Sequence, residues 1–509
     1  MQLPYRALLA LVLVGPGCVG RIGEVGETQA TDDAGNPIDT GSGGDAGSGD
    51  AGSDTGGSDG TVPTPPPCGS VRADVPAATR TLYVATTGSD TSGDGSATKP
   101  FASIAGARPS LKAGAALLLR AGTYQPKSAI VLEGLVGTAG AWIRIAAAPG
   151  EKVILDGSAA GGGGSGLLTV AASSYVLVEG LEVQKGGALV HVEDCDHVTV
   201  RDLRLHAGTR EGLLLVGTNL VAEDNEIWDV ANVNAGGAMS GGGWPGGIDT
   251  FHGKSGALTT NLVVRRNRVH EVWGECIIAA FVDGATIADN AVSDCYSTGI
   301  YGDHTRNLRV ERNLVWTTST TRDIGGSAMT GVDLMVEEYG SSDPAPFATE
   351  HVVVANNVVA RVGTAFGWYS DFDAKGNTYG DLVFAHNVVW QGKDAAFRFA
   401  KPGPSAAAPG PIRIVDNVLV APMAFDVRGA PVTAQGNCYE VTDVGDVVDK
   451  KPVTGACGLL SPSVPLTFEG FRLAPSAKAR GNGVPAKEVP LDAFCVPRSA
   501  SAPSIGVAE

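Results

Sequence analysis

A short pattern of apolar and polar positions recurs along most of the chain. Three neighbouring copies, "VRRNRV", "IADNAV" and "VERNLV", each read apolar, two polar, asparagine, any residue, valine. Their asparagines, Asn267, Asn290 and Asn313, are 23 residues apart. Short apolar runs rich in β-branched residues predict short strands, repeated here at a fixed period. The frame continues in further copies at Asn225, Asn357, Asn387, Asn417 and Asn437, and leucine takes the asparagine position at Leu181 and Leu203.

A period of 22 to 23 residues fits one coil of a parallel β-helix, in which each strand stacks on the coils before and after at ~4.8 Å. We interpret the asparagine as a structural corner residue, because asparagine tolerates the left-handed backbone of a tight turn and its amide can bond to neighbouring asparagines. A leucine-rich repeat would need a leucine pattern and helical returns, which are absent. A β-propeller blade would need about twice the period.

The stretch from Tyr83 to Tyr124, "YVATTGSDTSGDGSATKPFASIAGARPSLKAGAALLLRAGTY", resembles the opening of the pectate-lyase-like β-helix superfamily. The shared groups are "YV", "GSD" and "KPF", followed by a capping helix and "GTY". The resemblance implies an all-β fold, a right-handed single-stranded parallel β-helix with an N-terminal capping helix. It also implies action on extracellular polysaccharide, because members of the superfamily include lyases of uronic-acid polymers and some glycosidases.

The first 78 residues predict export followed by a spacer. Residues 1–18 have an apolar run after Arg6 and end in "GPGC", which resembles a lipoprotein cleavage box with Cys18 as the lipidated residue. An ordinary secretory signal cut after Gly17 is the alternative. Residues 19–78 are rich in Gly, Ser and Asp and predict a disordered linker. We expect the β-helix at 79–440, an irregular C-terminal cap at 441–509, and a protein at the outer membrane or cell surface, or else secreted or periplasmic.

The charge distribution indicates which partners to expect, and the cysteines indicate candidate disulfides. The net charge is -17, and nine of the acids lie between Arg21 and Arg72, a stretch without Lys or Arg. No basic stripe is present, so we expect no nucleic acid partner and contact with membrane only through a lipid on Cys18. We expect a monomer.

Two candidate disulfides follow from the cysteines of an exported protein, one between Cys438 and Cys457 and one between Cys68 and Cys495.

Aligning the coils on the repeat asparagines places the candidate catalytic and binding residues on one face. Ile248, Ile277, Ile300 and Val332 form one apolar column and should point into the core, so the residues after them should point out. We therefore expect one exposed polar face, with histidines and arginines beside it. Its acids and tyrosine are Glu211, Asp249, Glu275, Tyr301, Asp303 and Asp333, its neighbours are His252, His304, Lys254 and Arg306, and Glu337 follows nearby.

Two kinds of cleavage are compatible with this face. For a lyase, the resemblance implies Ca²⁺ that neutralises the sugar carboxylate and a Lys or Arg base; Asp249, Asp303 and Asp333 are the candidate ligands and Lys254 is the candidate base. In a glycosidase, Asp303 would pair with Asp333 or with Glu275 as the catalytic carboxylates, with His304 beside them. Asp249, His252, Tyr301 and Arg306 are candidate substrate-binding residues, as are Trp244 and Trp273 if they form a sugar-stacking wall rather than capping the core.

A third interpretation is that nothing on this face is catalytic, and that the chain binds glycan or builds the cell surface. Acids scattered on a β-helix surface are usually only solubilising. We favour an enzyme acting on an acidic polysaccharide, a lyase ahead of a hydrolase, because acids, histidines and aromatics concentrate between residues 210 and 340.

Overall fold

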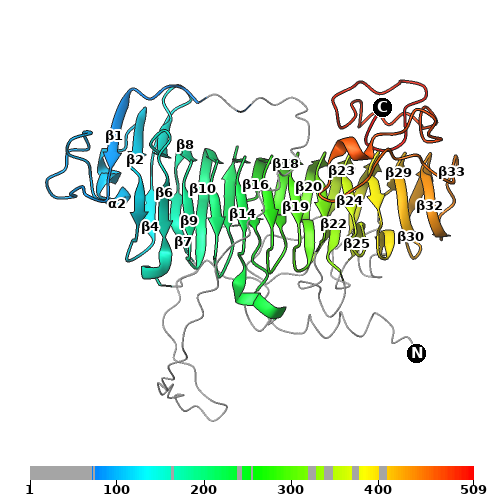
Figure 1. Cartoon of the computed structure of the whole chain (residues 1–509), viewed down its shortest axis with the longest axis horizontal. Coiled ribbons are helices and arrows are strands. Elements are labelled where there is room, and N and C mark those ends of the chain that lie inside the picture. The colour runs from blue at the N-terminus through cyan, green and yellow to red at the C-terminus, as the bar shows by residue number, and fades with distance from the viewer. Residues whose placement is uncertain are drawn as a thin grey trace, which may run out of the picture.

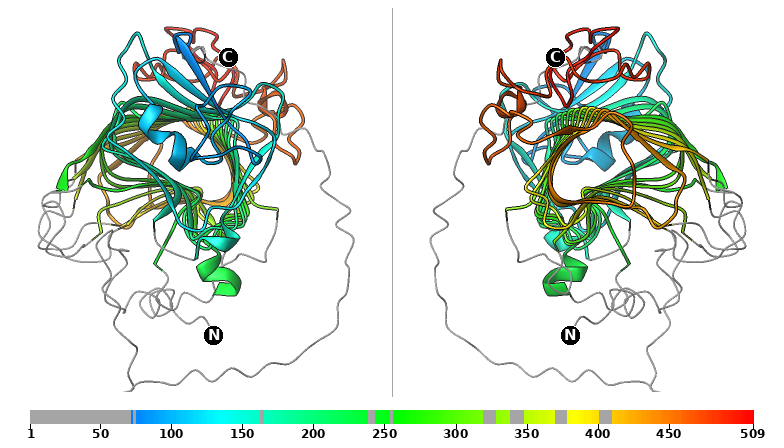
Figure 2. Two further views of the ribbon diagram at one scale, coloured as in Figure 1. Left: turned by 90° about the vertical axis from the view of Figure 1, so that its left-hand side faces the viewer. Right: turned by 90° about the vertical axis from the view of Figure 1, so that its right-hand side faces the viewer.

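The chain winds into a parallel β-helix with three sheets (Figure 1). The computed structural model describes residue 72 and residues 75–161, 165–237, 243–253, 256–318, 328–337, 348–369, 378–400 and 410–509. Each coil contributes one strand to each sheet, and strands of successive coils pair in parallel, as in Ile277↔Ile300 and Ile300↔Val332. Looking along the axis, Figure 2 shows the coils superposed around a closed cross-section.

Sheet 1 carries the column predicted from the repeat and forms one long face. Its strands, in coil order, are β4 (Ile130–Glu133), β7 (Gly166–Ala171), the start of β10 (Ala188–Arg201), β12 (Leu213–Thr218), β15 (Ile248–Thr250), the start of β18 (Ile277–Ala288), the start of β20 (Thr298–Glu311), β22 (Thr330–Met335), β25 (Phe366–Tyr369), β28 (Ala395–Phe399) and the end of β30 (Val418–Asp426).

Sheet 2 precedes the asparagine corner. Its strands are β1 (Arg80–Val84), β2 (Ala115–Leu119), β5 (Ile143–Ala147), β8 (Ser174–Glu179), the ends of β10, β18 and β20, β13 (Val221–Glu223), β16 (Thr259–Arg265), β23 (Thr349–Ala355), β26 (Tyr379–Ala385), β29 (Ile412–Val415) and β31 (Val432–Gln435).

Sheet 3 follows that corner with strands of mostly three residues. They are β3 (Gly122–Tyr124), β6 (Val153–Asp156), β9 (Glu182–Gln184), β11 (Arg204–His206), β14 (Glu226–Trp228), β17 (Arg268–His270), β19 (Ala291–Ser293), β21 (Leu314–Trp316), β24 (Val358–Ala360), β27 (Val388–Trp390), the start of β30, β32 (Cys438–Gly445) and β33 (Val453–Thr454).

The core is a set of aliphatic stacks along the axis. Ile248, Ile277, Ile300 and Val332 are each at most 1% exposed and belong to one continuous cluster, which confirms the predicted column. Each fully buried side chain of this kind contributes about 1.5–3 kcal/mol to stability. Short α2 (Ile104–Ala107) buries Ile104 and Ala107 and lies across the N-terminal end of the solenoid, as the resemblance implied (Figure 2).

The asparagine ladder is present, but its backbone differs from the prediction. Asn290 is fully buried, donates its backbone and amide N–H groups to Asn313 Oδ1 at 3.0 Å, and accepts both equivalent groups of Asn267. The left-handed residue is the one before each asparagine, for example Asp289 with φ 59° and Arg312 with φ 54°. These two side chains pair at 2.8 Å, so the strained corner also forms an ion-pair ladder.

The C-terminal region also packs along the outer surface of sheet 3. Phe468 and Phe471 of a 3-10 turn (Phe468–Phe471), with Ile505 and Val507, pack on outward residues of sheet 3 from Ala291 onward. In Figure 1 this red segment lies over the later coils. The segment therefore covers outer surface that is apolar, which the sequence interpretation as an end cap did not predict.

Disulfides stabilise both the solenoid and this region. Cys438 pairs with Cys457, as predicted. Cys276 pairs with Cys295, which the sequence did not suggest. Cys495 is also disulfide-bonded, Cys195 is buried with a free thiol, and the predicted partner Cys68 lies outside the described residues.

Candidate functional site

The outward side of sheet 1 carries most of the residues that were predicted from the sequence to form the site. Tyr301 lies in register between Ile278 and Asp333, and Asp249 pairs with Leu214 of the preceding coil. The alignment of coils is therefore confirmed residue by residue. The face is not openly exposed, however, since Glu211, Tyr301, Asp303 and Asp333 are all buried.

Five carboxylates lie on this face, on the coils of β12, β15, β18 and β22, and we call Glu211, Asp249, Glu275, Asp333 and Glu337 the acidic cluster. Glu275 is its centre and is 9% exposed. Burial, followed by the charges of Glu337, Asp249 and Asp333, raises the pKa of Glu275 well above its ordinary value. These surroundings therefore favour the protonated form of Glu275.

Asp249 and Glu211 lie on adjacent coils and have opposite protonation tendencies. Burial, then the charge of Glu211, raises the pKa of the part-exposed Asp249 to about 8. Burial also opposes ionisation of Glu211, but the hydrogen bond and charge of His191 outweigh it and hold the pKa of Glu211 below its ordinary value. The pair thus combines a protonated and an ionised carboxyl, the arrangement that acid–base catalysis uses.

His191 sets this difference, and the sequence analysis missed it. Its Nδ1 lies 2.9 Å from Glu193 Oε1 and its Nε2 lies 3.0 Å from Glu211 Oε1. Burial alone would lower the pKa of His191, but the two glutamates raise it to about 9. The available signal was the register, because His191 precedes Leu214 and Asp249 in one column.

Asp333 occupies the other end of the acidic cluster. It is 4% exposed and accepts hydrogen bonds from the hydroxyls of Thr298 and Thr330. Burial raises the pKa of Asp333 to about 6 even though these hydroxyls favour the carboxylate. Asp333 is therefore positioned with a partly retained proton near neutral pH.

Asp303 was expected to be exposed, and this expectation is wrong. Its side chain is 0% exposed; Oδ1 accepts the backbone N–H of Glu337 at 3.1 Å and lies 2.9 Å from His304 Nδ1. His304 is also buried, with its ring stacked on Phe281 at 4.9 Å between centroids. Alternation along the strand gave the correct direction, but it could not reveal the segment of Glu337 that packs over this pair. The catalytic roles assigned to Asp303 and His304 remain predictions.

An outer apolar cluster fills the same part of the face. Ile278, Ala280, Phe281, Tyr301 and Met335 are buried together outside the solenoid, with Phe251 and Leu258 against them. Within it the Tyr301 hydroxyl donates to Glu337 Oε1 at 2.8 Å, which ties Tyr301 to the acidic cluster. The His252 ring packs edge-on to Phe281 at 5.1 Å, so this predicted substrate-binding residue borders the apolar cluster.

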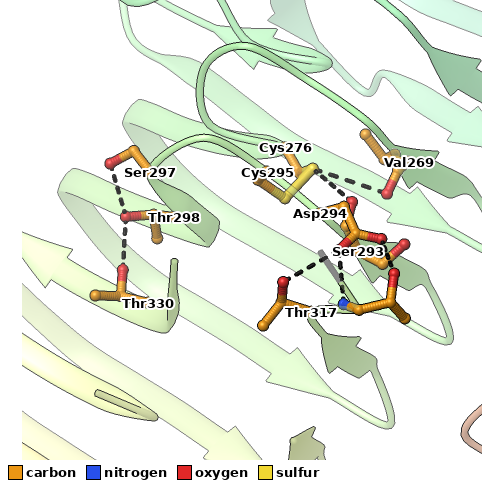
Figure 3. Close-up of a disulfide and its surroundings, with 10 residues drawn as sticks. Val269, Cys276, Ser293, Asp294, Cys295, Ser297, Thr298, Thr317 and Thr330 are labelled. Atoms are coloured by element: carbon orange, nitrogen blue, oxygen red, sulfur yellow. Dashed lines mark hydrogen bonds between the residues drawn. A yellow bond between two sulfur atoms is a disulfide. The ribbon is translucent and has the colours of Figure 1, made fainter. Parts of the chain in front are cut away.

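The two tryptophans form one aromatic group beside the acidic cluster. Trp244 stacks on Tyr296 at 6.0 Å between ring centroids, and Trp273 lies 5.6 Å from the same ring. Both tryptophans are part-exposed. Trp273 also packs on the main core. It therefore both caps the core and presents a part-exposed ring, the two alternatives that the sequence left open. A disulfide joins Cys276 to Cys295 at this corner (Figure 3). Glu275 directly precedes Cys276 in the sequence and Tyr296 directly follows Cys295, so the disulfide restrains both.

Of the three remaining candidates, one lies away from the site and two fall outside the described residues. Arg306 lies beyond the bend of β20 on sheet 2 and donates to Asp283 Oδ2 at 2.9 Å, so its predicted place on this face is wrong. The error arose because the left-handed residue His304 turns the chain between Asp303 and Arg306. Lys254 and Cys18 lie outside the described residues.

The acids predicted to hold calcium do not converge. Asp249 and Asp333 are three coils apart, ~14 Å along the axis, while Asp303 is engaged by His304 and Glu337. In the described part of the chain, no group of three or more His, Cys, Asp or Glu side chains is arranged to hold a metal ion. Calcium itself stays a prediction, and the donor set proposed from sequence does not fit it.

Comparisons with known proteins agree with this architecture. A family model described as Pel9A-like, right handed beta helix region matches residues 82–257. The crystal structure of pectate lyase Pel9A is 17% identical, with a TM-score of 0.52, covering 85% of this chain and 96% of that chain. GH136 lacto-N-biosidase from Eubacterium ramulus is 12% identical, with a TM-score of 0.50, covering 74% and 68%. No curated protein matches the chain.

Proposed function

Because the chain is a pectate-lyase-like right-handed parallel β-helix, we propose that it cleaves glycosidic bonds of an extracellular polysaccharide on the outward side of sheet 1. The fold alone does not assign an activity, so the proposal rests on the site. The supporting observation is the pair of adjacent carboxyls, Asp249 and Glu211, whose surroundings move their pKa values in opposite directions.

This pair favours hydrolysis. Asp249 is the proton donor to the leaving glycosidic oxygen, because it is part-exposed and has a pKa of about 8. Glu211, held ionised by His191, is the carboxylate that stabilises positive charge on the sugar or activates water. One water molecule is consumed, its hydroxyl joining the anomeric carbon and its proton restoring the acid.

The surrounding residues support this assignment. Burial and the neighbouring carboxylates, Asp249 among them, raise the pKa of Glu275 and oppose its ionisation, which limits the negative charge of the cluster. Trp244 and Trp273 supply part-exposed rings at the edge of the cluster, and sugar rings pack on aromatic faces. Tyr301, tied to Glu337, supports that carboxylate from the side of the outer apolar cluster.

Elimination is the second candidate, and the likeness to pectate lyase Pel9A favours it. In that reaction a base removes the proton α to a uronate carboxylate, the leaving oxygen departs, and no water is added to the sugar. Lys254 stays the candidate base. The carboxyls of the acidic cluster offer no positive charge to neutralise the uronate carboxylate, so this reaction would need a cation on the face.

The location of the protein is also a proposal. Export, with a lipid on Cys18 and residues 19–78 as a tether, would bring the β-helix to polysaccharide outside the cell. In the part of the chain that the structure describes, no helix has the length and apolarity to cross a membrane.

The test is incubation of purified protein with neutral and uronate polysaccharides, with and without EDTA. New reducing ends without ultraviolet absorbance from an unsaturated sugar are expected for hydrolysis. Reducing ends accompanied by that absorbance would instead establish elimination. Absence of product from every polymer, with the protein folded, would remove both enzymatic proposals and leave binding.

A further inference from the structure

The outer surface of sheet 3 changes character halfway along the solenoid. From β19 onward its outward residues, such as Ala291, Leu314 and Val358, are apolar and are covered by the C-terminal region. In the earlier coils the same columns carry charged and aromatic side chains. One column reads Glu182, Arg204, Glu226 and Arg268, and the other reads Gln184, His206, Trp228 and His270.

In the ion pairs on these earlier coils, the cation is well exposed to solvent and its carboxylate partner is more buried. Lys152 is 71% exposed while its partner Glu182 is 13% exposed, and Arg204 is 56% exposed while Glu226 is 22% exposed. Lys185 and Arg268 repeat the arrangement with Asp156 and Glu226. The carboxylates therefore lie beneath and the cationic heads point to solvent. We call Lys152, Lys185, Arg204 and Arg268 the cation row.

Rigid aromatic stacking supports the row. The rings of His206 and Trp228 are parallel, with centroids 4.2 Å apart, and the Arg204 guanidinium lies 4.9 Å from the Trp228 centroid. His270 continues the stack on the other side of Trp228. A guanidinium held in this way loses little freedom when it binds an anion, which favours recognition of a carboxylate.

A surface cavity of about 480 Å³ lies at the start of the row. Its lining includes Lys152, Glu182, Arg204, His206 and Trp228. This volume is within the range of small-molecule sites, and the lining combines an aromatic ring with charged groups at the rim. From the coil of Lys152 to that of Arg268 are four coil steps, ~19 Å, enough for several consecutive sugars.

We propose that this surface is a second, non-catalytic glycan site that takes a chain of carboxylate-bearing sugars. The spaced cationic heads match a polymer with repeated carboxylates, and the hydrogen-bonding groups beside them match sugar hydroxyls. It lies on sheet 3, whereas the acidic cluster lies on sheet 1. The site would hold an acidic polysaccharide on the protein independently of the residues that cleave it.

The test is titration with polygalacturonate at low salt, using calorimetry. Protein carrying Asp249→Asn is used as the background to limit cleavage of the polymer. Adding Lys152→Gln and Arg204→Gln should weaken binding at least tenfold, while the matched control Arg306→Gln, which removes a part-exposed paired cation on sheet 2, should not change it. A fully methyl-esterified polymer should bind the background protein at least tenfold more weakly than polygalacturonate.

Undiminished binding in the Lys152→Gln, Arg204→Gln protein would overturn the proposal, as would an equal loss in Arg306→Gln, which would indicate general charge attraction. Equal affinity for the esterified polymer would also overturn it. Because the readout is binding, the result does not depend on whether the sheet 1 face cleaves any polysaccharide. Circular dichroism of each variant checks that the β-helix is retained.

Discussion

The ring of His191 lies 3.0 Å from Oε1 of Glu211, through Nε2, in a site where the histidine is 1% exposed. This contact links three coils, since it holds Glu211 ionised and Glu211 in turn raises the pKa of Asp249. The protonation states proposed for catalysis therefore depend on a residue that need not touch the substrate.

Replacing His191 tests this dependence. His191→Gln removes the positive charge, so the pKa of Glu211 should rise under the remaining influence of burial. If Glu211 must be ionised, the acid limb of the pH profile of kcat/KM should move to higher pH. An unchanged profile with a lower plateau would instead assign His191 a purely structural role.

Stability should fall as pH rises from about 6.5 to 8. Asp249 and Asp416 each have a folded-state pKa of about 8, above the ordinary value, so in this range the folded chain binds protons that the unfolded chain has released. Each such group contributes up to about 1.4 kcal/mol of lost stability per pH unit. His386, whose pKa is lowered by burial, opposes this trend only below about 6.5.

Thermal unfolding across this pH range provides the measurement. Asp249→Asn should flatten the decline, because the amide has no proton to lose. Asp443→Asn, on an exposed carboxyl, is the matched control and should leave the slope unchanged. A midpoint that rises between pH 6.5 and 8 would contradict the assigned pKa directions.

The asparagine ladder should be sensitive to a single truncation. Asn290→Ala removes two donors and leaves the Asn267 groups and the carbonyl of Val264 without their partner inside the solenoid. Buried polar groups left unsatisfied cost about 1–3 kcal/mol each, so we expect a loss of at least ~2 kcal/mol in denaturant unfolding. Asn482→Ala, at an exposed position, should cost less than ~0.5 kcal/mol. Equal effects would argue against the ladder as a main stabilising element.

The disulfide at Cys276 and Cys295 should affect catalysis as well as stability. It closes a 19-residue separation (Figure 3), and its two cysteines are sequence neighbours of Glu275 and Tyr296. Its replacement by two alanines should therefore cost about 2–4 kcal/mol and raise KM. Removing Cys438 and Cys457, which also close a 19-residue separation, is the matched control. It should lower stability similarly while KM stays unchanged, and a parallel rise in KM would show a general effect of destabilisation.

The repeat predicted the fold well because Asn267, Asn290 and Asn313 mark every turn of the same corner, and a fixed period determines which residues share a column. It predicted less of the site. Asp303 points away from the core as expected, but a column does not reveal that Glu337 covers it. Arg306 was misplaced because one left-handed residue, His304, directs the chain onto another sheet. His191 was missed because its importance depends on contacts across coils, with Glu211 above all.

The proposed hydrolysis requires Asp249 as its proton donor. Its most direct test is the rate of bond cleavage by Asp249→Asn on a polysaccharide that the wild-type protein degrades, compared at equal folded concentration. General acid catalysis accounts for about 10²–10⁴-fold, so we expect a loss of at least ~100-fold in kcat with little change in KM. A variant that retains wild-type kcat would show that Asp249 is not the proton donor.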